Sequence, residues 1–182
     1  MTVVLDTSFL LYLFAPTGQV GSPRDANGEP VRFVKERVAG LIAELEKSQT
    51  KIIVPTPALS EIMVRAGVEA GQEYISLLKR SGIVRIVPFD EKAAIETAIM
   101  AGDVARCPAI RPATDGTAAK VKYDRQIVAI AVTEGATKLY TDDKNLSAFA
   151  KRHRLMVVGI EDCLVPTSDA QGNLELIIPT EQ

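Results

Sequence analysis

Tryptophan is absent from this chain of 182 residues, and histidine occurs only once, as His153. Cysteine occurs twice, at Cys107 and Cys163, which lie far apart in the sequence. A zinc site of the Cys/His type and a disulfide-held fold both need more of these residues than one chain offers here. The single histidine lies in a basic run, which argues against a Ser/His or Cys/His catalytic triad. Oxygen-containing side chains are therefore the candidates for any chemistry.

An excess of charge is also lacking, because 21 Lys and Arg residues oppose 23 Asp and Glu residues, for a net charge of −2. Any binding of nucleic acid must therefore use local basic patches. Aromatic residues make up only 5% of the chain, which disfavours a platform that stacks on single-stranded bases. The N-terminus lacks the basic start of a signal peptide, and its apolar run is too short to span a bilayer. We expect a soluble, cytoplasmic protein with no membrane partner.

Short apolar runs rich in β-branched residues alternate with longer stretches of helical periodicity along the chain. The short runs predict buried strands, and the alternation predicts a parallel sheet with helices on both faces. Thr56 and Asp90 are suited to cap two of the helices. Strands are expected at residues 3–5, 52–54, 83–87, 138–140 and 156–158. The predicted fold class is therefore α/β, with three α/β/α layers and a central, mainly parallel sheet of about five strands.

Two polar stretches interrupt this alternation. Residues 16–30 and 107–119 are rich in proline, glycine and small polar residues, which predicts loops. An apolar run at 174–178 follows a predicted turn and is a candidate edge strand. Because no linker or internal repeat divides the chain, we predict a single domain over residues 1–182, with loop insertions at 16–30 and 107–119.

Acidic residues occur where the predicted elements meet. Asp6 directly follows the first strand, and Asp142 and Asp143 follow the fourth. Glu61 and Asp124 lie near the starts of two predicted helices. Because ligands bind beyond the carboxyl ends of parallel strands, these acids are expected to converge at one edge of the sheet.

Each acid also has an ordinary structural explanation. Asp142 or Asp143 is suited to cap the helix that follows, and Glu61 is suited to pair with Arg65 one turn later. Their convergence favours a shared site, since clustered carboxylates repel one another unless a cation lies between them. A set of oxygen ligands without His or Cys favours a hard ion, Mg²⁺ or Mn²⁺.

Four segments carry a resemblance to a known family: LDTSFLL at the N-terminus, PALSEI, YDRQIVAIAV, and LYTDDKNLSAF. In this order they resemble the PIN domain, a family of metal-dependent ribonucleases that includes VapC-type toxins of toxin–antitoxin pairs. The resemblance covers nearly the whole chain. It implies a PIN-like fold and Mg²⁺ or Mn²⁺ as cofactor. It places the catalytic and metal-binding acids at Asp6, Glu61, Asp124 and Asp143, with supporting roles for Thr7, Ser8, Thr141 and Asp142.

The family pattern of threonine, any residue and aspartate selects Asp143 over Asp142 as the fourth acid. The implied activity is that of an endoribonuclease, a hydrolase that cleaves RNA phosphodiester bonds. Three basic residues near Asp124 are expected to hold the RNA backbone: Lys120, Lys122 and Arg125.

The resemblance also implies partners: RNA as substrate, a small antitoxin protein, and a second copy of the chain in a homodimer. Two alternatives stay open. One is a PIN-like module that binds RNA or protein without catalysis, although an inactive copy has no physical reason to keep four mutually repelling acids. The other is a housekeeping RNA-processing nuclease, which the long stretches at 16–30 and 107–119 favour over a compact toxin.

Overall fold

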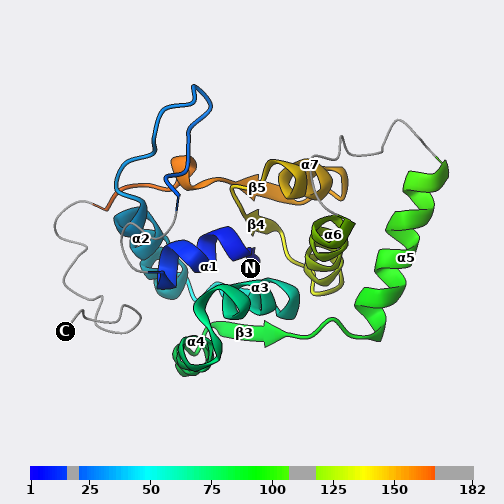
Figure 1. The fold of residues 1–182 in the computed structure, drawn as a ribbon, viewed down its shortest axis with the longest axis horizontal. Helices are drawn as coiled ribbons and strands as arrows, with labels where there is room; N and C mark the ends of the chain where they lie inside the picture. The colour runs from blue at the N-terminus through cyan, green and yellow to red at the C-terminus, as the bar shows by residue number, and fades with distance from the viewer. Residues whose placement is uncertain (16–20, 107–117, 167–182) are drawn as a thin grey trace.

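The computed structural model describes residues 1–15, 21–106 and 118–166. Five parallel strands form the centre of the molecule (Figure 1). The strand order is β3-β2-β1-β4-β5. The predicted α/β class and the five parallel strands are confirmed. The strands are β1 (Thr2–Leu5), β2 (Lys51–Pro55), β3 (Val84–Val87), β4 (Lys138–Tyr140) and β5 (Met156–Val158).

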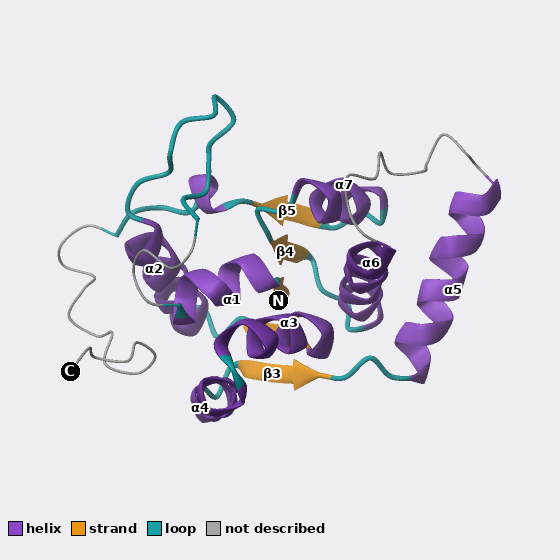
Figure 2. Ribbon diagram, viewed as in Figure 1, coloured by secondary structure: helices purple, strands orange, loops and turns teal. Residues whose placement is uncertain are grey.

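Helices cover both faces of this sheet (Figure 2). Helices α2 and α4 lie on one side of the strands in Figure 1, and α5 and α6 lie on the other. The connections from β1 to β2 and from β2 to β3 run in one direction across the sheet, and the connection from β3 to β4 runs in the other. Because such crossovers are right-handed, their helices lie on opposite faces. The α-helices are α1 (Thr7–Phe14), α2 (Val34–Lys47), α3 (Thr56–Ala66), α4 (Val68–Arg80), α5 (Glu91–Arg106), α6 (Ala118–Thr133) and α7 (Lys144–Arg152), and a 3₁₀ helix, η2, spans Ile160–Asp162. Among the described residues, no helix combines the length and the apolar character needed to cross a bilayer.

The strands are apolar because they are buried in the core of the protein. Val3 and Val4 of the central strand β1 have no exposed surface, because helices pack on both faces of the sheet. Helix α6 is buried over five consecutive residues, 127–131, since it contacts α5, α7 and the sheet. Asp6 directly follows β1 and Asp124 lies on α6, so two acids of the predicted site are attached to deeply buried elements.

The loop predictions are confirmed in part. Residues 21–30 lie outside the helices and strands of the sheet, and an isolated bridge joins Arg24 to Pro30. The prediction for 107–119 is wrong at its end, because α6 already begins at Ala118. The rest of that stretch, residues 16–20, and the candidate edge strand at 174–178 lie outside the described residues.

The two predicted helix caps have different outcomes. Asp90 caps α5 as predicted, with its Oδ1 accepting a hydrogen bond from the Ala93 N–H at 3.0 Å. The prediction for Thr56 is wrong, since Thr56 is the first residue of α3 and Pro55 is its N-cap. The Thr56 hydroxyl instead accepts a hydrogen bond from the Phe89 N–H at 3.1 Å, so it ties α3 to the end of β3.

The strand register positions the candidate site. Leu5 of β1 lies opposite Tyr140 of β4, so the next residues along each strand, Asp6 and Thr141, leave the sheet side by side. The strand β1 has β2 as its neighbour on one side and β4 on the other, so the order of strands along the chain reverses at β1. Ligands of parallel α/β sheets bind at such a reversal of strand order.

Candidate active site

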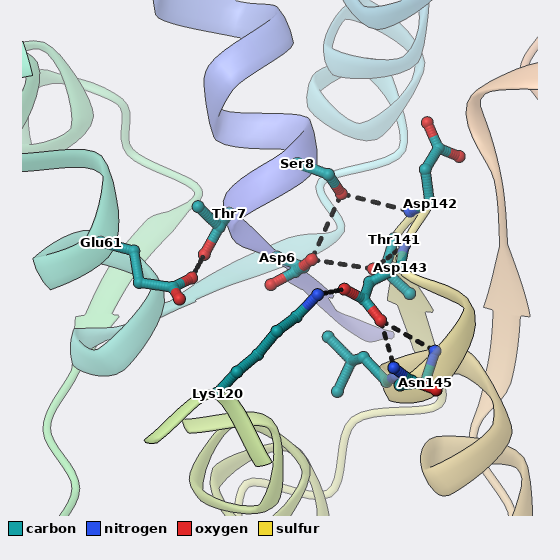
Figure 3. A network of polar contacts seen from close by, with 10 residues as sticks. Asp6, Thr7, Ser8, Glu61, Lys120, Thr141, Asp142, Asp143 and Asn145 are labelled. Atoms are coloured by element: carbon teal, nitrogen blue, oxygen red, sulfur yellow. Dashed lines mark hydrogen bonds and ion pairs between the residues drawn. The ribbon is translucent and has the colours of Figure 1, made fainter. Parts of the chain in front are cut away.

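Asp6 lies at the centre of the candidate site, directly after β1 and at the N-cap of α1 (Figure 3). The residue is 4% exposed, and its Oδ2 accepts hydrogen bonds from the Thr141 hydroxyl at 2.8 Å and the Ser8 hydroxyl at 3.2 Å. Burial raises the pKa of Asp6, and the nearby Glu61 carboxylate adds to this increase, although the hydrogen bond from Thr141 opposes it. An ionised Asp6 is therefore held in an unfavourable environment.

Thr141 links Asp6 to the second acid of the site. Its hydroxyl donates its proton to Asp6 and accepts a hydrogen bond from the Asp143 N–H at 3.0 Å. The side chain is 2% exposed and both of these bonds lie within the protein. Thr141 thus fixes the distance between the end of β1 and the start of α7.

Asp143 has two roles in the structure. It is the N-cap of α7, and its Oδ1 accepts hydrogen bonds from the backbone N–H groups of Asn145 and Leu146 at 2.8 and 3.0 Å. Its Oδ2 forms an ion pair with the Lys120 ammonium (Figure 3). Burial alone would raise the pKa of Asp143, but Lys120 and the helix N–H groups outweigh burial and lower it.

Glu61 reaches the site from the second turn of α3. The Thr7 hydroxyl donates a hydrogen bond of 2.5 Å to its Oε2, across the space between α1 and α3 (Figure 3). Thr7 itself is buried, so its hydroxyl has little access to water as an alternative hydrogen-bond partner. The ordinary alternative for Glu61, a pairing with Arg65 one turn later, does not describe this contact.

Asp124 approaches the other acids from α6. Burial raises the pKa of its carboxyl to about 7, and the carboxylates of Asp143, Asp6 and Glu61 contribute to this increase, while Lys120 opposes it. The increase is therefore caused first by burial and then by the neighbouring acidic side chains.

Asp142 is directed away from this group. Its Oδ2 accepts a hydrogen bond from the Tyr12 hydroxyl at 2.7 Å, and its Oδ1 accepts one from the Ile160 N–H at 2.8 Å. Its own N–H donates to Ser8 at 3.2 Å. Asp142 therefore joins α1 to η2, and both of its oxygens have partners in the protein.

A cavity of about 470 Å³ lies among these residues. All five acids discussed above contribute to its lining. It is lined by Asp6, Thr7, Ser8, Leu11, Tyr12, Glu61, Arg65, Lys120, Tyr123, Asp124, Asp142 and Asp143. The four acids expected to bind metal and all the supporting residues except the buried Thr141 thus border one cavity.

Only one of the three basic residues expected to contact RNA lines the cavity. Lys120 lines the cavity, whereas Lys122 is exposed on α6 and neither it nor Arg125 contributes to the lining. Arg65 is a cavity residue that the sequence reasoning treated only as a surface partner of Glu61. Tyr12, Leu11 and Tyr123 were not predicted as site residues, although Leu11 and Tyr123 lie within the segments LDTSFLL and YDRQIVAIAV. The helical spacing of Arg65 one turn after Glu61 was the available signal for its position.

The acids supply the oxygen ligands that Mg²⁺ and Mn²⁺ prefer. Within the described residues, however, no three Asp, Glu, His or Cys side chains are arranged closely enough to hold an ion as they stand. The side-chain contacts give the reason, since Thr7 holds Glu61 and Lys120 holds Asp143. The chemistry of the donors fits a divalent ion, and side-chain movement is needed to complete the ligand set.

The raised pKa of Asp124 predicts a measurable dependence of stability on pH. A carboxyl with a pKa of about 7 in the folded protein and 3.8 in the unfolded chain binds its proton more tightly when folded. Its contribution to stability is therefore full below pH 3.8 and is lost as the pH rises through 7. In metal-free buffer, the melting temperature of Asp124→Asn relative to the unsubstituted protein should increase by about 5 °C between pH 5 and pH 8.

Thermal melts of the two proteins in EDTA measure this difference. Asp143 does not obscure it, because its lowered pKa places its own effect below pH 4. A constant difference in melting temperature across this range would contradict the raised pKa of Asp124.

Comparison with known proteins supports the fold. No protein-family profile matches the sequence, and no curated protein matches it. The structure is similar to a chain of VapBC2 from Rickettsia felis bound to a DNA fragment from the promoter, with a TM-score of 0.58, 15% identity, and coverage of 87% of this chain and 98% of that chain. It is also similar to a chain of DNA-bound VapBC from Salmonella typhimurium, with a TM-score of 0.53, 14% identity, and coverage of 88% and 98%. The chain therefore has the fold found in VapBC complexes, which confirms the PIN-type α/β fold implied by its sequence motifs.

Proposed function

We propose that this protein is a metal-dependent endoribonuclease that acts as the toxin of a toxin–antitoxin pair. The observation that carries this proposal is that four acids border one cavity at the carboxyl ends of β1 and β4: Asp6, Glu61, Asp124 and Asp143. These acids come from four different elements and repel one another, as the raised pKa of Asp124 reflects. A fold has no structural need for such a cluster, whereas a divalent ion would stabilise it.

The same four carboxylates would hold the ion, with Thr141 and Ser8 fixing the orientation of Asp6. When bound, Mg²⁺ or Mn²⁺ would supply a water molecule activated near neutral pH and positive charge for the phosphate. Asp143 is restrained by the first turn of α7 through its Oδ1, so its Oδ2 would reach an ion without loss of the helix cap. The absence of histidine from the described cavity lining is consistent with this type of chemistry.

RNA is the substrate class that the PIN resemblance implies, and the cavity offers groups suited to it. Arg65 lies on the lining and Lys120 lies beside the acids, so a phosphate that enters meets cationic side chains. Tyr123, on the same lining, offers an aromatic face to a base. Lys122 and Arg125 on α6 would contact the RNA backbone beyond the cavity.

A small antitoxin is the proposed protein partner. The similar structures are VapBC complexes, and the family resemblance implies that a VapC-type toxin is paired with an antitoxin. Val64 and Val68 are 83% and 69% exposed and lie on either side of Arg65 in the sequence, at the end of α3 and the start of α4. They offer exposed apolar surface for a partner segment. A second copy of the chain is a further proposed partner.

The experiment that tests the proposed activity uses purified protein and a mixture of cellular RNA. Cleavage is expected with millimolar Mn²⁺ or Mg²⁺ and is expected to stop in EDTA, because the acids alone offer no activated water. Asp124→Asn, which removes one ligand charge, serves as the inactive control. Cleavage that continues unchanged in EDTA would contradict the metal dependence.

Growth measurements separate a toxin from a housekeeping nuclease. Expression of the chain by itself should slow growth, and the Asp124→Asn protein should not. A protein that cleaves RNA in the test tube but has no effect on growth would favour the housekeeping alternative. Absence of cleavage under all metal conditions, with intact RNA binding, would favour the non-catalytic module.

A further inference from the structure

Lys120 reaches the acids of the candidate site with its ammonium, although its side chain is 45% exposed. It lies on α6, one helical turn before Asp124, and its ammonium forms an ion pair with Asp143 on α7 (Figure 3). The electrostatic influence of Asp124 and Glu61 also reaches Lys120, and together with Asp143 these acids raise its pKa. One cation thus interacts with three of the four acids proposed to hold a metal.

The position of Lys120 conflicts with the requirements of a bound ion. Asp143 has one oxygen committed to the N–H groups of α7 and its other oxygen paired with Lys120. An ion at Asp143 would therefore have to share Oδ2 with the Lys120 ammonium while this pair persists. A divalent ion at the same acids would also lie close to the ammonium and be repelled by it.

We propose that Lys120 is the counter-ion of the metal-free site and competes with the divalent ion for Asp143, so that the ion binds as Lys120 leaves. This inference rests on the proposed metal-dependent function. It explains why four repelling acids stay together without metal, and why no three of them within the described residues form a ready ligand set. Lys120 is then a positioning residue for Asp143 and sets the metal affinity of the site.

Calorimetric titration with Mn²⁺ tests this competition directly. Lys120→Met keeps a side chain of similar length but removes the charge, so the variant should bind Mn²⁺ about tenfold more tightly than the unsubstituted protein. Lys120→Arg retains the charge and should stay within about twofold of the unsubstituted protein. Lys144→Met is the matched control, because Lys144 is exposed and adjacent to Asp143 in the sequence. It loses the same charge and should also stay within about twofold.

Thermal melts distinguish competition from a purely structural role. In EDTA at pH 8, Lys120→Met should melt below the unsubstituted protein, because the acids have lost their counter-ion. Saturating Mn²⁺ should remove this difference. A structural role for the Lys120 side chain would instead lower the melting temperature equally with and without Mn²⁺.

The outcomes also separate this inference from the proposed function. If the unsubstituted protein binds Mn²⁺ and Lys120→Met binds it equally or less tightly, the inference is wrong and the proposed function stands. If none of the proteins binds Mn²⁺, the proposed metal dependence is wrong and the inference is wrong with it. Detectable binding by Lys120→Met alone would support the inference in its strongest form.

Discussion

Asp6→Asn is expected to lower the rate of RNA cleavage by about a thousandfold or more while the protein stays folded and becomes more stable without metal. The rate falls because the substitution removes the charge of the most deeply buried acid of the site. The fold survives because the asparagine oxygen still accepts the hydrogen bonds that Thr141 and Ser8 donate to Asp6. The stability rises because burial disfavours the ionised carboxylate, and asparagine carries no charge.

Single-turnover cleavage of a labelled RNA in Mn²⁺ measures the rate, and a thermal melt in EDTA at pH 8 measures the stability. Glu44→Gln is the matched control, since Glu44 is exposed on α2 and outside the cavity. It loses the same charge and should change neither quantity. An Asp6→Asn protein that cleaves at the original rate would overturn the proposed role of the four acids.

Asp143→Asn is expected to reduce mainly activity, and Asp142→Asn is expected to reduce mainly stability. Asp143→Asn should lower cleavage by about a hundredfold or more, because it removes a ligand charge. Its effect on α7 should be small, since asparagine is as good an N-cap as aspartate. Asp142→Asn should keep most of the activity but lower stability by about 1–2 kcal/mol, because it weakens the charge-assisted bonds to Tyr12 and Ile160.

Urea unfolding and the same cleavage assay, applied to both variants, decide between the two neighbouring acids. The comparison needs no further control, because each variant serves as the control of the other. A greater loss of activity in Asp142→Asn would assign the fourth ligand to Asp142 and would contradict the family pattern used to select Asp143.

The strands were predictable because they are short and buried on both faces, so their apolar runs are distinct from the amphipathic helices. Helix starts were less predictable. Helix α4 begins at Val68, although the apolar spacing is regular only from Tyr74 onward, since its first turns contain glycine and exposed polar residues. Gly71 is buried there because α4 packs closely on Met63 of α3, which is a tertiary contact without a local sequence signal.

The acids of the site were predictable because parallel strands bring their carboxyl ends to one edge. Their pairings were not, since they join residues far apart in the sequence. Thr7 and Glu61 are separated by 54 positions, and no spacing rule connects them. Lys120 was expected to contact RNA because it is basic and near Asp124, but its contact with Asp143 depends on how closely α6 packs on α7.

The pairing of β1 with β4 has a consequence for biosynthesis. Asp6 and Thr141 are separated by 135 positions, and β1 lies between strands that the ribosome makes much later. During translation the emerging chain can pair β1 with β2 early, but the acids of β1 and β4 meet only after most of the chain has left the ribosome. A nascent chain that stops before residue 138 therefore carries Asp6, Glu61 and Asp124 but has no assembled site. The candidate site is therefore completed late in synthesis, by contact between Asp6 near the start of the chain and Thr141 far along it.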